Sequence, residues 1–425
     1  MIGMRSLGAA AALSVLAAAG VAPVRAADLG GDCCADLEER IAELEATTAR
    51  KGNRKVSLTI AGWVSEQVLF WDDGEESNVY VQSLGTAFAS NFNLTGQAQI
   101  SPGITAGFVL HLEFDSNNVY TTTQDNPNGP PGDQVLYANW FIKSEDLGKI
   151  SVGKISPADD SAVVAIDGSG TLAAAYWVAY DVFSFRVRGN FAPGDSLIWG
   201  NAISCRGYGG GPGDCDGLPR NVVRYDSPVF AGFMVSASWG EDDIWAVAGK
   251  YAAEFSGFKL AAVATYSETT DQAIGGPAVG GALEYLQASA FLHHVPSGLW
   301  GQVAWGHLDQ SVNPDDFPET DAYYVKSGVR LKVNSLGATI PYGEYLYGTD
   351  GALIVNDNGT AGNTADDVTR VVEDSESTFW GFGVVQEIDA AAMSIWLRYR
   401  SHDVDVPGVD TKGLDTVVFG GFINF

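Results

Sequence analysis

The residue types that carry most enzyme chemistry are present in this chain, but their spacing matches no catalytic or metal-binding motif. No pair of histidines has HExxH spacing, and neither a Gly-x-Ser-x-Gly elbow nor a phosphate-binding loop occurs. The acidic loops lack the spacing of a calcium-binding loop. We therefore predict that the chain is not an enzyme and has no metal site or cofactor. The five histidines are His111, His293, His294, His307 and His402.

Charged residues instead alternate with apolar residues along extended segments. In residues 394–402, Ile395 and Leu397 lie on one face, while Arg398 and Arg400 lie on the other. A charge facing lipid costs about 2–4 kcal/mol at the middle of a bilayer, so in a membrane barrel these charges should line the water-filled interior. The predicted lumen-wall residues are Lys143, Arg220, Arg224, Lys326, Arg330, Lys332, Arg398 and Arg400. A soluble β-sandwich would show the same alternation.

The lengths of the connections favour the barrel over the sandwich. Short turns on one side and long polar loops on the other are typical of outer-membrane barrels. Seven short turns pair fourteen strands, and one strand at each end gives a sixteen-stranded antiparallel barrel. The short turns are at 101–103, 146–148, 227–232, 254–257, 295–298, 334–337 and 388–390. The long loops are at 116–133, 157–218, 270–280, 310–320 and 349–370.

The N-terminal residues predict export. Residues 1–26 have a basic start, an apolar run from Leu7 to Val21 and a cleavage site before Ala27, as in a signal peptide. Residues 27–54 form a periplasmic segment that contains a short amphipathic helix or coiled coil at 36–50. The transmembrane barrel then occupies residues 55–425.

Two further features agree with export. Cys205 and Cys215 flank a turn-rich stretch and are predicted to form a disulfide in an oxidising compartment. Residues 419–425 form a final strand that ends in Phe425, which resembles the signal read by the outer-membrane assembly machinery.

The segment at 32–64, DCCADLEERIAELEATTARKGNRKVSLTIAGWV, resembles the start of alphaproteobacterial porins of the Brucella type. The KISVGK strand at 149–154, the long loop after it, the paired-cysteine loop and the terminal Phe are similar as well. The resemblance implies an all-β barrel of sixteen strands in the Gram-negative outer membrane, in contact with lipid and lipopolysaccharide. It also implies a homotrimer, passive diffusion of small hydrophilic solutes, and a third loop folded into the pore. Related barrels can be attached to peptidoglycan through a terminus like Ala27.

That third loop follows the fifth predicted strand and carries charges of both signs. Acidic and basic groups on opposite sides of a constriction would create a transverse field that selects ions. The predicted constriction residues are Asp159, Asp160, Asp167, Asp181, Arg186 and Arg188.

The net charge of −28 excludes a nucleic-acid partner and suggests a weak preference for cations. Two alternatives share most of these features. A substrate-selective channel, for example for a sugar, would have the same barrel, and a secreted β-rich binding protein would have the same export signal and alternation.

Overall fold

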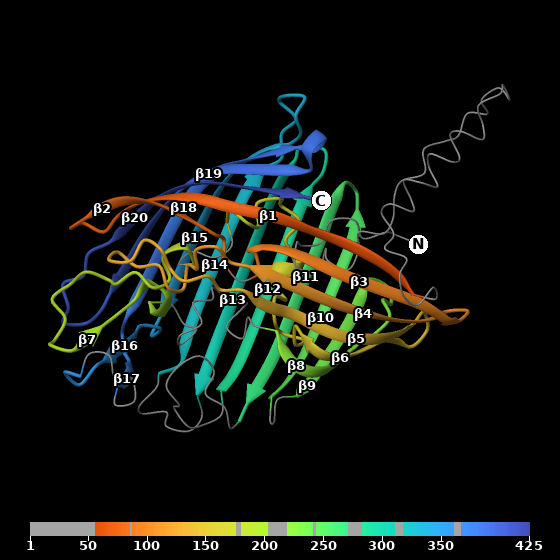
Figure 1. The fold of residues 1–425 in the computed structure, drawn as a ribbon, viewed down its shortest axis with the longest axis horizontal. Helices are drawn as coiled ribbons and strands as arrows, with labels where there is room; N and C mark the ends of the chain where they lie inside the picture. Colours follow the sequence, from red (N-terminus) through yellow and green to blue (C-terminus); the bar gives the residue numbers. More distant parts are fainter. Residues whose placement is uncertain are drawn as a thin grey trace.

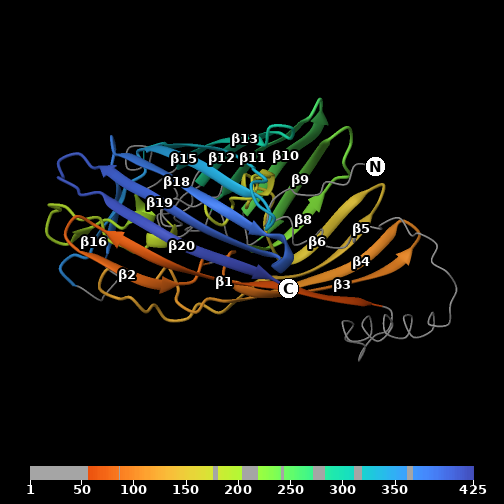
Figure 2. The same cartoon turned by 90° about the horizontal axis from the view of Figure 1, so that it is seen from above.

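The fold is a closed antiparallel β-barrel, seen in a computed structural model that describes residues 56–85, 87–175, 180–202, 219–240, 244–270, 283–310, 318–360 and 367–425 (Figures 1 and 2). The predicted signal peptide, N-terminal helix and Cys205–Cys215 disulfide lie outside these residues. The barrel strands are β1 (Ser57–Asp72), β3 (Ser90–Ser101), β4 (Ile104–Phe114), β5 (Gln134–Ser144), β6 (Gly148–Ile155), β8 (Arg220–Asp226), β9 (Phe233–Gly240), β10 (Ile244–Phe255), β11 (Phe258–Thr269), β12 (Leu283–His294), β13 (Leu299–Gln310), β14 (Thr320–Val329), β15 (Thr339–Thr349), β18 (Glu376–Ile388), β19 (Met393–Asp405) and β20 (Leu414–Asn424).

Pairing between the first and last strands closes the barrel. β1 runs antiparallel to β20, from Trp63 opposite Asn424 to Asp72 opposite Asp415. On its other side, the first half of β1 pairs with β3 and the second half with the short β2 (Ser77–Gln82). The sheet thus contains β2 and the sixteen barrel strands, which confirms the predicted strand number.

Each of the seven predicted short turns joins two neighbouring strands, from β3–β4 to β18–β19. The turn between β18 and β19 lies beside the C terminus, where Asn424 N–H donates to Ala392 O at 3.0 Å. The small sheet of β7 (Asp195–Ser196), β16 (Leu353–Asn356) and β17 (Val368–Val371) lies at the opposite end (Figure 1). We call these the short-turn end and the long-loop end.

The predicted alternation separates two faces of the wall. On β4, Phe108 and Phe114 are exposed on the outer face, while His111 and Glu113 are buried on the inner one. Among the described residues, no helix is long and apolar enough to cross a membrane. The backbone groups of the barrel strands are paired with their neighbours around the closed ring.

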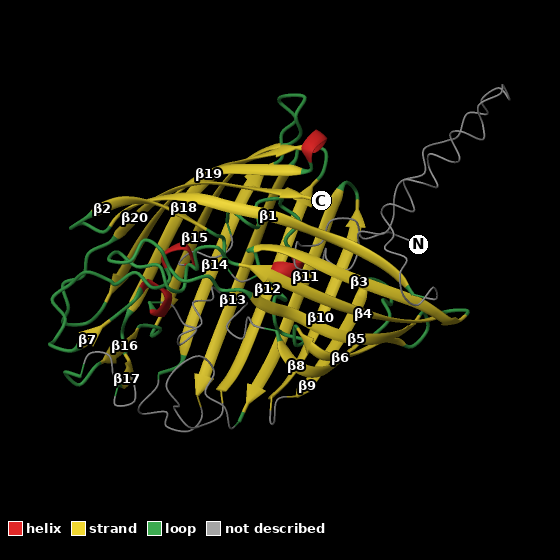
Figure 3. Cartoon of the chain, in the orientation of Figure 1, coloured by secondary structure: helices red, strands yellow, loops and turns green. Residues whose placement is uncertain are grey.

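The loop between β6 and β8 folds inward and forms much of the buried core. Three short helical turns, η1 (Val164–Ile166), η2 (Tyr180–Val182) and η3 (Trp199–Asn201), interrupt it (Figure 3). Phe185 packs edge-on against Trp71 of β1, with ring centroids 5.3 Å apart, and Trp199 packs against Phe379 of β18 at 6.0 Å. Aromatic contacts of this kind fix the loop against the wall.

Candidate channel and its inward loop

The first part of the inward loop is held by wall side chains that bond its backbone. Gln287 on β12 donates to Asp159 O at 3.0 Å, and Gln302 on β13 donates to Val163 O at 3.1 Å. Ser238 on β9 accepts from Ala158 N–H at 2.9 Å. Three wall strands thus satisfy loop backbone groups that water would otherwise have to satisfy.

The loop turns after η1 at a buried ion pair. Lys326 on β14 donates to Asp167 Oδ2 at 2.5 Å and to Ala175 O at 3.2 Å, and the side chains of both Lys326 and Asp167 are fully buried. Two residues further along, Ser169 O accepts from Arg330 at 2.9 Å. Arg330 also pairs with Glu387 of β18 at 2.7 Å.

A second group of charges holds the loop near η2. Arg398 of β19 donates to Asp181 Oδ2 and, at 2.6 Å, to Ala174 O. Arg400, one inward-facing position along β19, donates to Glu344 of β15 at 2.7 Å and lies 3.4 Å from Asp181 Oδ2. Asp181 also accepts from Gln67 of β1 at 2.8 Å, so it is bonded from both sides of the barrel closure.

These contacts change the electrostatics expected from the sequence. Asp167 and Asp181 do not face the basic wall across open water. Asp167 binds Lys326 and Asp181 binds Arg398, while Arg400 binds Glu344, so three carboxylates match three basic charges. Asp159 and Asp160 are also buried, with 1% and 5% of their surfaces exposed.

The two predicted loop arginines lie apart from this group. Arg186 is exposed and lies 3.7 Å from Asp125. Arg188 donates to Asp73 Oδ2 at 2.7 Å, beyond the end of β1. Burial would raise the pKa of Asp73, but hydrogen bonds from the backbone of Glu76 and Glu75 and from Arg188 outweigh it and lower the pKa below 3.8.

Seven of the predicted wall residues are on or next to barrel strands, and Lys332 is not. β14 ends at Val329, so Lys332 is exposed in the connection to β15 and does not line the lumen wall. Arg224 donates twice to Asp226, at 3.0 and 2.8 Å, and to Ser156 O at 2.9 Å. Lys143 lies on the lumen face of β5, and Arg220 is the first residue of β8.

The alternation pattern missed several residues that hold the loop. Glu344 belongs to the inner face of β15 together with buried Ile340, Tyr342 and Leu346, so that face does not look polar in the sequence. Gln287 and Gln302 carry no charge, and a search for charges passes over them. Alternation along β12 and β13 places both glutamines on the inner face, and this was the one sequence signal that could have identified them.

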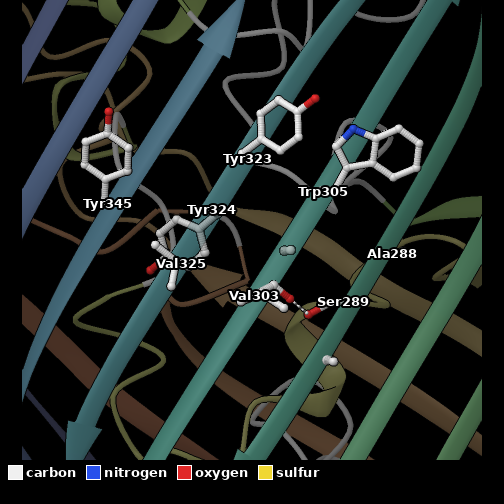
Figure 4. A pocket seen from close by; sticks show the side chains of 10 residues that line it. Ala288, Ser289, Val303, Trp305, Tyr323, Tyr324, Val325 and Tyr345 are labelled. Carbon is white, nitrogen blue, oxygen red and sulfur yellow. Dashed lines mark hydrogen bonds between the residues drawn. The ribbon is translucent and has the colours of Figure 1, made fainter.

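A pocket of about 510 Å³ lies on the outer side of β12 to β15 (Figure 4). Val303 and Tyr323, two of its lining residues, are 55% and 49% exposed on the lipid-facing surface. Its lining is almost entirely apolar, with Ala288 and Ala290 leaving room between larger side chains. It is a depression in the membrane-facing wall.

Solved structures with a similar fold include a porin and an outer-membrane channel. The anion-selective porin of Comamonas acidovorans is 15% identical, with a TM-score of 0.52 over 87% of this chain and 100% of the other. Salmonella typhi OmpF, solved with daunomycin, is 13% identical, with a TM-score of 0.52 over 88% and 99%. The channel DcaP of Acinetobacter baumannii is 10% identical, with a TM-score of 0.51 over 89% and 100%. No curated protein matches the chain.

An outer-membrane channel fold is defined here by three features: the closed barrel, its short-turn and long-loop ends, and its polar interior. The family model for Gram-negative porins matches residues 9–414, and the chain belongs to this family. Its location is therefore the Gram-negative outer membrane, which it crosses as a multi-pass β-barrel. Membership of the porin family argues against the alternative of a secreted β-rich binding protein.

Proposed function

We propose that this protein forms a water-filled channel for passive diffusion of small hydrophilic solutes and ions. The observation that carries the proposal is the inward loop between β6 and β8, bonded to β9, β12, β13, β14 and β19 by side chains from the lumen wall. A loop anchored at this many points narrows the lumen without closing it by a mobile lid. The narrowing sets a size limit for solutes.

The weak cation preference expected from the net charge finds little support inside the barrel. The net charge is a property of the whole chain and does not give the charge inside the barrel. In the lumen, Asp167, Asp181 and Glu344 are each matched by a basic partner. A narrow pore selects by the charges that remain free at its wall. The charge preference of the channel is therefore set by other lumen residues.

The resemblance also implies partners, which we propose for this protein. The barrel would assemble as a homotrimer in lipid and lipopolysaccharide, and the assembly machinery would read Phe425. Phe425 is 64% exposed, and its backbone exchanges hydrogen bonds with Gly62. Linkage to peptidoglycan through Ala27 and the Cys205–Cys215 disulfide concern residues outside those described and remain predictions.

Single-channel recording in a planar bilayer tests the proposed function. Purified, detergent-extracted protein should give ohmic openings. If the trimer is intact, each insertion should show three equal conductance steps. Swelling of proteoliposomes in sugars of increasing size should fall smoothly with size. Saturable block by one sugar would instead indicate a substrate-selective channel, and folded protein without conductance would refute the channel.

A further inference from the structure

Three lysines on the lumen wall differ from the basic side chains that pair with carboxylates in the described part of the lumen. Lys326, Arg330, Arg398, Arg400, Arg224 and Arg188 each have a carboxylate partner. Within the described ranges, no carboxylate lies within salt-bridge distance of Lys143, Lys149 or Lys250. Their ammonium charges are therefore not cancelled by direct ion pairs.

The three lysines lie on the inner face of β5, β6 and β10. Trp140 and Ile142 of β5, Ile150 of β6 and Val247 of β10 are all exposed on the lipid-facing side. Because side chains alternate along a strand, Lys143, Lys149 and Lys250 point to the lumen. Lys149 lies 4.9 Å from the ring centroid of Phe141, an interaction that positions its ammonium group on that face.

The strand register places these lysines along one stretch of the lumen wall toward the short-turn end. Lys143 and Lys149 are direct partners on β5 and β6, where they flank the turn. Lys149 is in turn the partner of Asp226 on β8. Lys250 lies on β10, three strands from Lys149 on β6 and therefore about 14 Å away across the sheet.

Direct cross-strand pairing of like charges destabilises a sheet, so the Lys143–Lys149 pair is not explained by stability. Asp226, opposite Lys149, offsets part of this charge, but its Oδ1 already accepts two bonds from Arg224 and one, at 2.7 Å, from Ser236. The Arg224–Asp226 pair is neutral overall. The group of Lys143, Lys149, Lys250, Arg224, Asp226 and Asp160, whose charge acts on Lys250, thus carries a net charge of about +2 at neutral pH.

We propose that Lys143, Lys149 and Lys250 form an extended basic region of the lumen wall that attracts small anions, and that this region makes the channel prefer anions. Clustered ammonium groups beside water attract chloride, and attract a divalent oxyanion such as hydrogen phosphate more strongly. The ammonium is a flexible point charge that suits loose, reversible binding. Such binding admits an ion without trapping it. This inference rests on the proposed channel function and reverses the charge preference expected from the net charge of −28.

Reversal potentials in a potassium chloride gradient test the proposal. The wild-type channel should have a chloride-to-potassium permeability ratio above 1. In the triple variant Lys143→Gln, Lys149→Gln, Lys250→Gln, that ratio should fall by about fivefold at low salt, with less change at 1 M salt because screening shortens the reach of the charges. Inorganic phosphate should reduce the wild-type chloride current at lower concentrations than it does in the triple variant.

Two matched variants separate this basic region from general effects of charge. Lys154→Gln removes a lysine from β6 that points away from the lumen and bonds Val135 O at 2.8 Å, and it should leave the ratio unchanged. Arginine at all three positions keeps the charge and should keep the anion preference. If the triple variant does not fold, as judged by the heat-dependent gel shift of the barrel, the three single glutamine variants should each lower the ratio partially.

A conducting triple variant with an unchanged ratio, or a wild-type ratio below 1, would overturn the proposed role of this basic region. Neither result would affect the proposed channel function, since current would still flow. Absence of current from folded wild-type protein would instead refute the channel itself. The two failures are therefore distinguishable in one experiment.

Discussion

Lys326 Nζ and Asp167 Oδ2 lie 2.5 Å apart although 159 residues separate them in the sequence. One belongs to the barrel wall and the other to the loop that enters the barrel. Both side chains are fully buried, so neither charge has water as an alternative partner. The contact therefore decides where the loop lies within the lumen.

Replacing Asp167 by Asn should loosen the inward loop. A buried ion pair that loses one partner leaves an uncompensated charge, at a cost of about 3–5 kcal/mol. We expect faster amide hydrogen exchange in residues 163–171 and noisier single-channel currents. The double variant Asp167→Leu, Lys326→Met removes both charges and should restore slow exchange. Equal exchange in Asp167→Asn and wild type would show that the pair does not hold the loop.

Gly170 should not tolerate a side chain. Its φ of +82° is unfavourable for other residues, and an added Cβ would lie 2.3 Å from Arg330 Nη1. Gly170→Ala should therefore displace Arg330 from Ser169 O and Glu387 and change single-channel conductance. Gly359→Ala is the control, because Gly359 has a similar φ of +74° but no atom within 4 Å of its added Cβ. Both variants incur a backbone cost of about 1–2 kcal/mol, and only the first should alter the current.

Asp115 should make the segment between β2 and β3 sensitive to pH. Burial raises the pKa of Asp115 to about 6, aided by the charges of Glu66 and Asp133, although Ser83 donates to its carboxylate and lowers it. A raised carboxyl pKa stabilises the fold at pH below the unfolded value of about 3.9, and this stabilisation is lost as pH rises through 6. The amides of residues 83–85 should therefore be less protected from hydrogen exchange at pH 7.5 than at pH 5, once the rates are corrected for the intrinsic effect of pH. Asp115→Asn mimics the protonated form and should abolish the difference.

Trp140 tests which face of β5 contacts lipid. Its side chain is 50% exposed near the middle of the strand. Trp140→Arg should destabilise the protein in lipid vesicles, with a free energy of unfolding about 2–4 kcal/mol smaller than that of Trp140→Leu. The leucine variant accounts for loss of the indole ring, so the difference isolates the charge. Urea titration of vesicle-inserted protein measures it, and equal values would place Trp140 away from the hydrocarbon.

The sequence alone predicted the barrel because local patterns control strand formation and strand pairing. Alternation in segments such as 394–402 separates a lipid face from a lumen face, and short turns force consecutive strands to be neighbours. These features need only contacts between residues close in the chain, or between adjacent strands. The sixteen strands and the seven short turns followed from them.

Tertiary structure decided which charges remain free in the lumen. Alternation places Lys143, Lys326 and Arg398 on the same inner face, but only the path of the inward loop brings Asp167 to Lys326 and Asp181 to Arg398. That path depends on packing between residues more than 100 positions apart, such as Gln67 with Asp181, which no local pattern encodes. The net charge of the chain is fixed by composition, whereas the field in the channel depends on which opposite charges end up in contact.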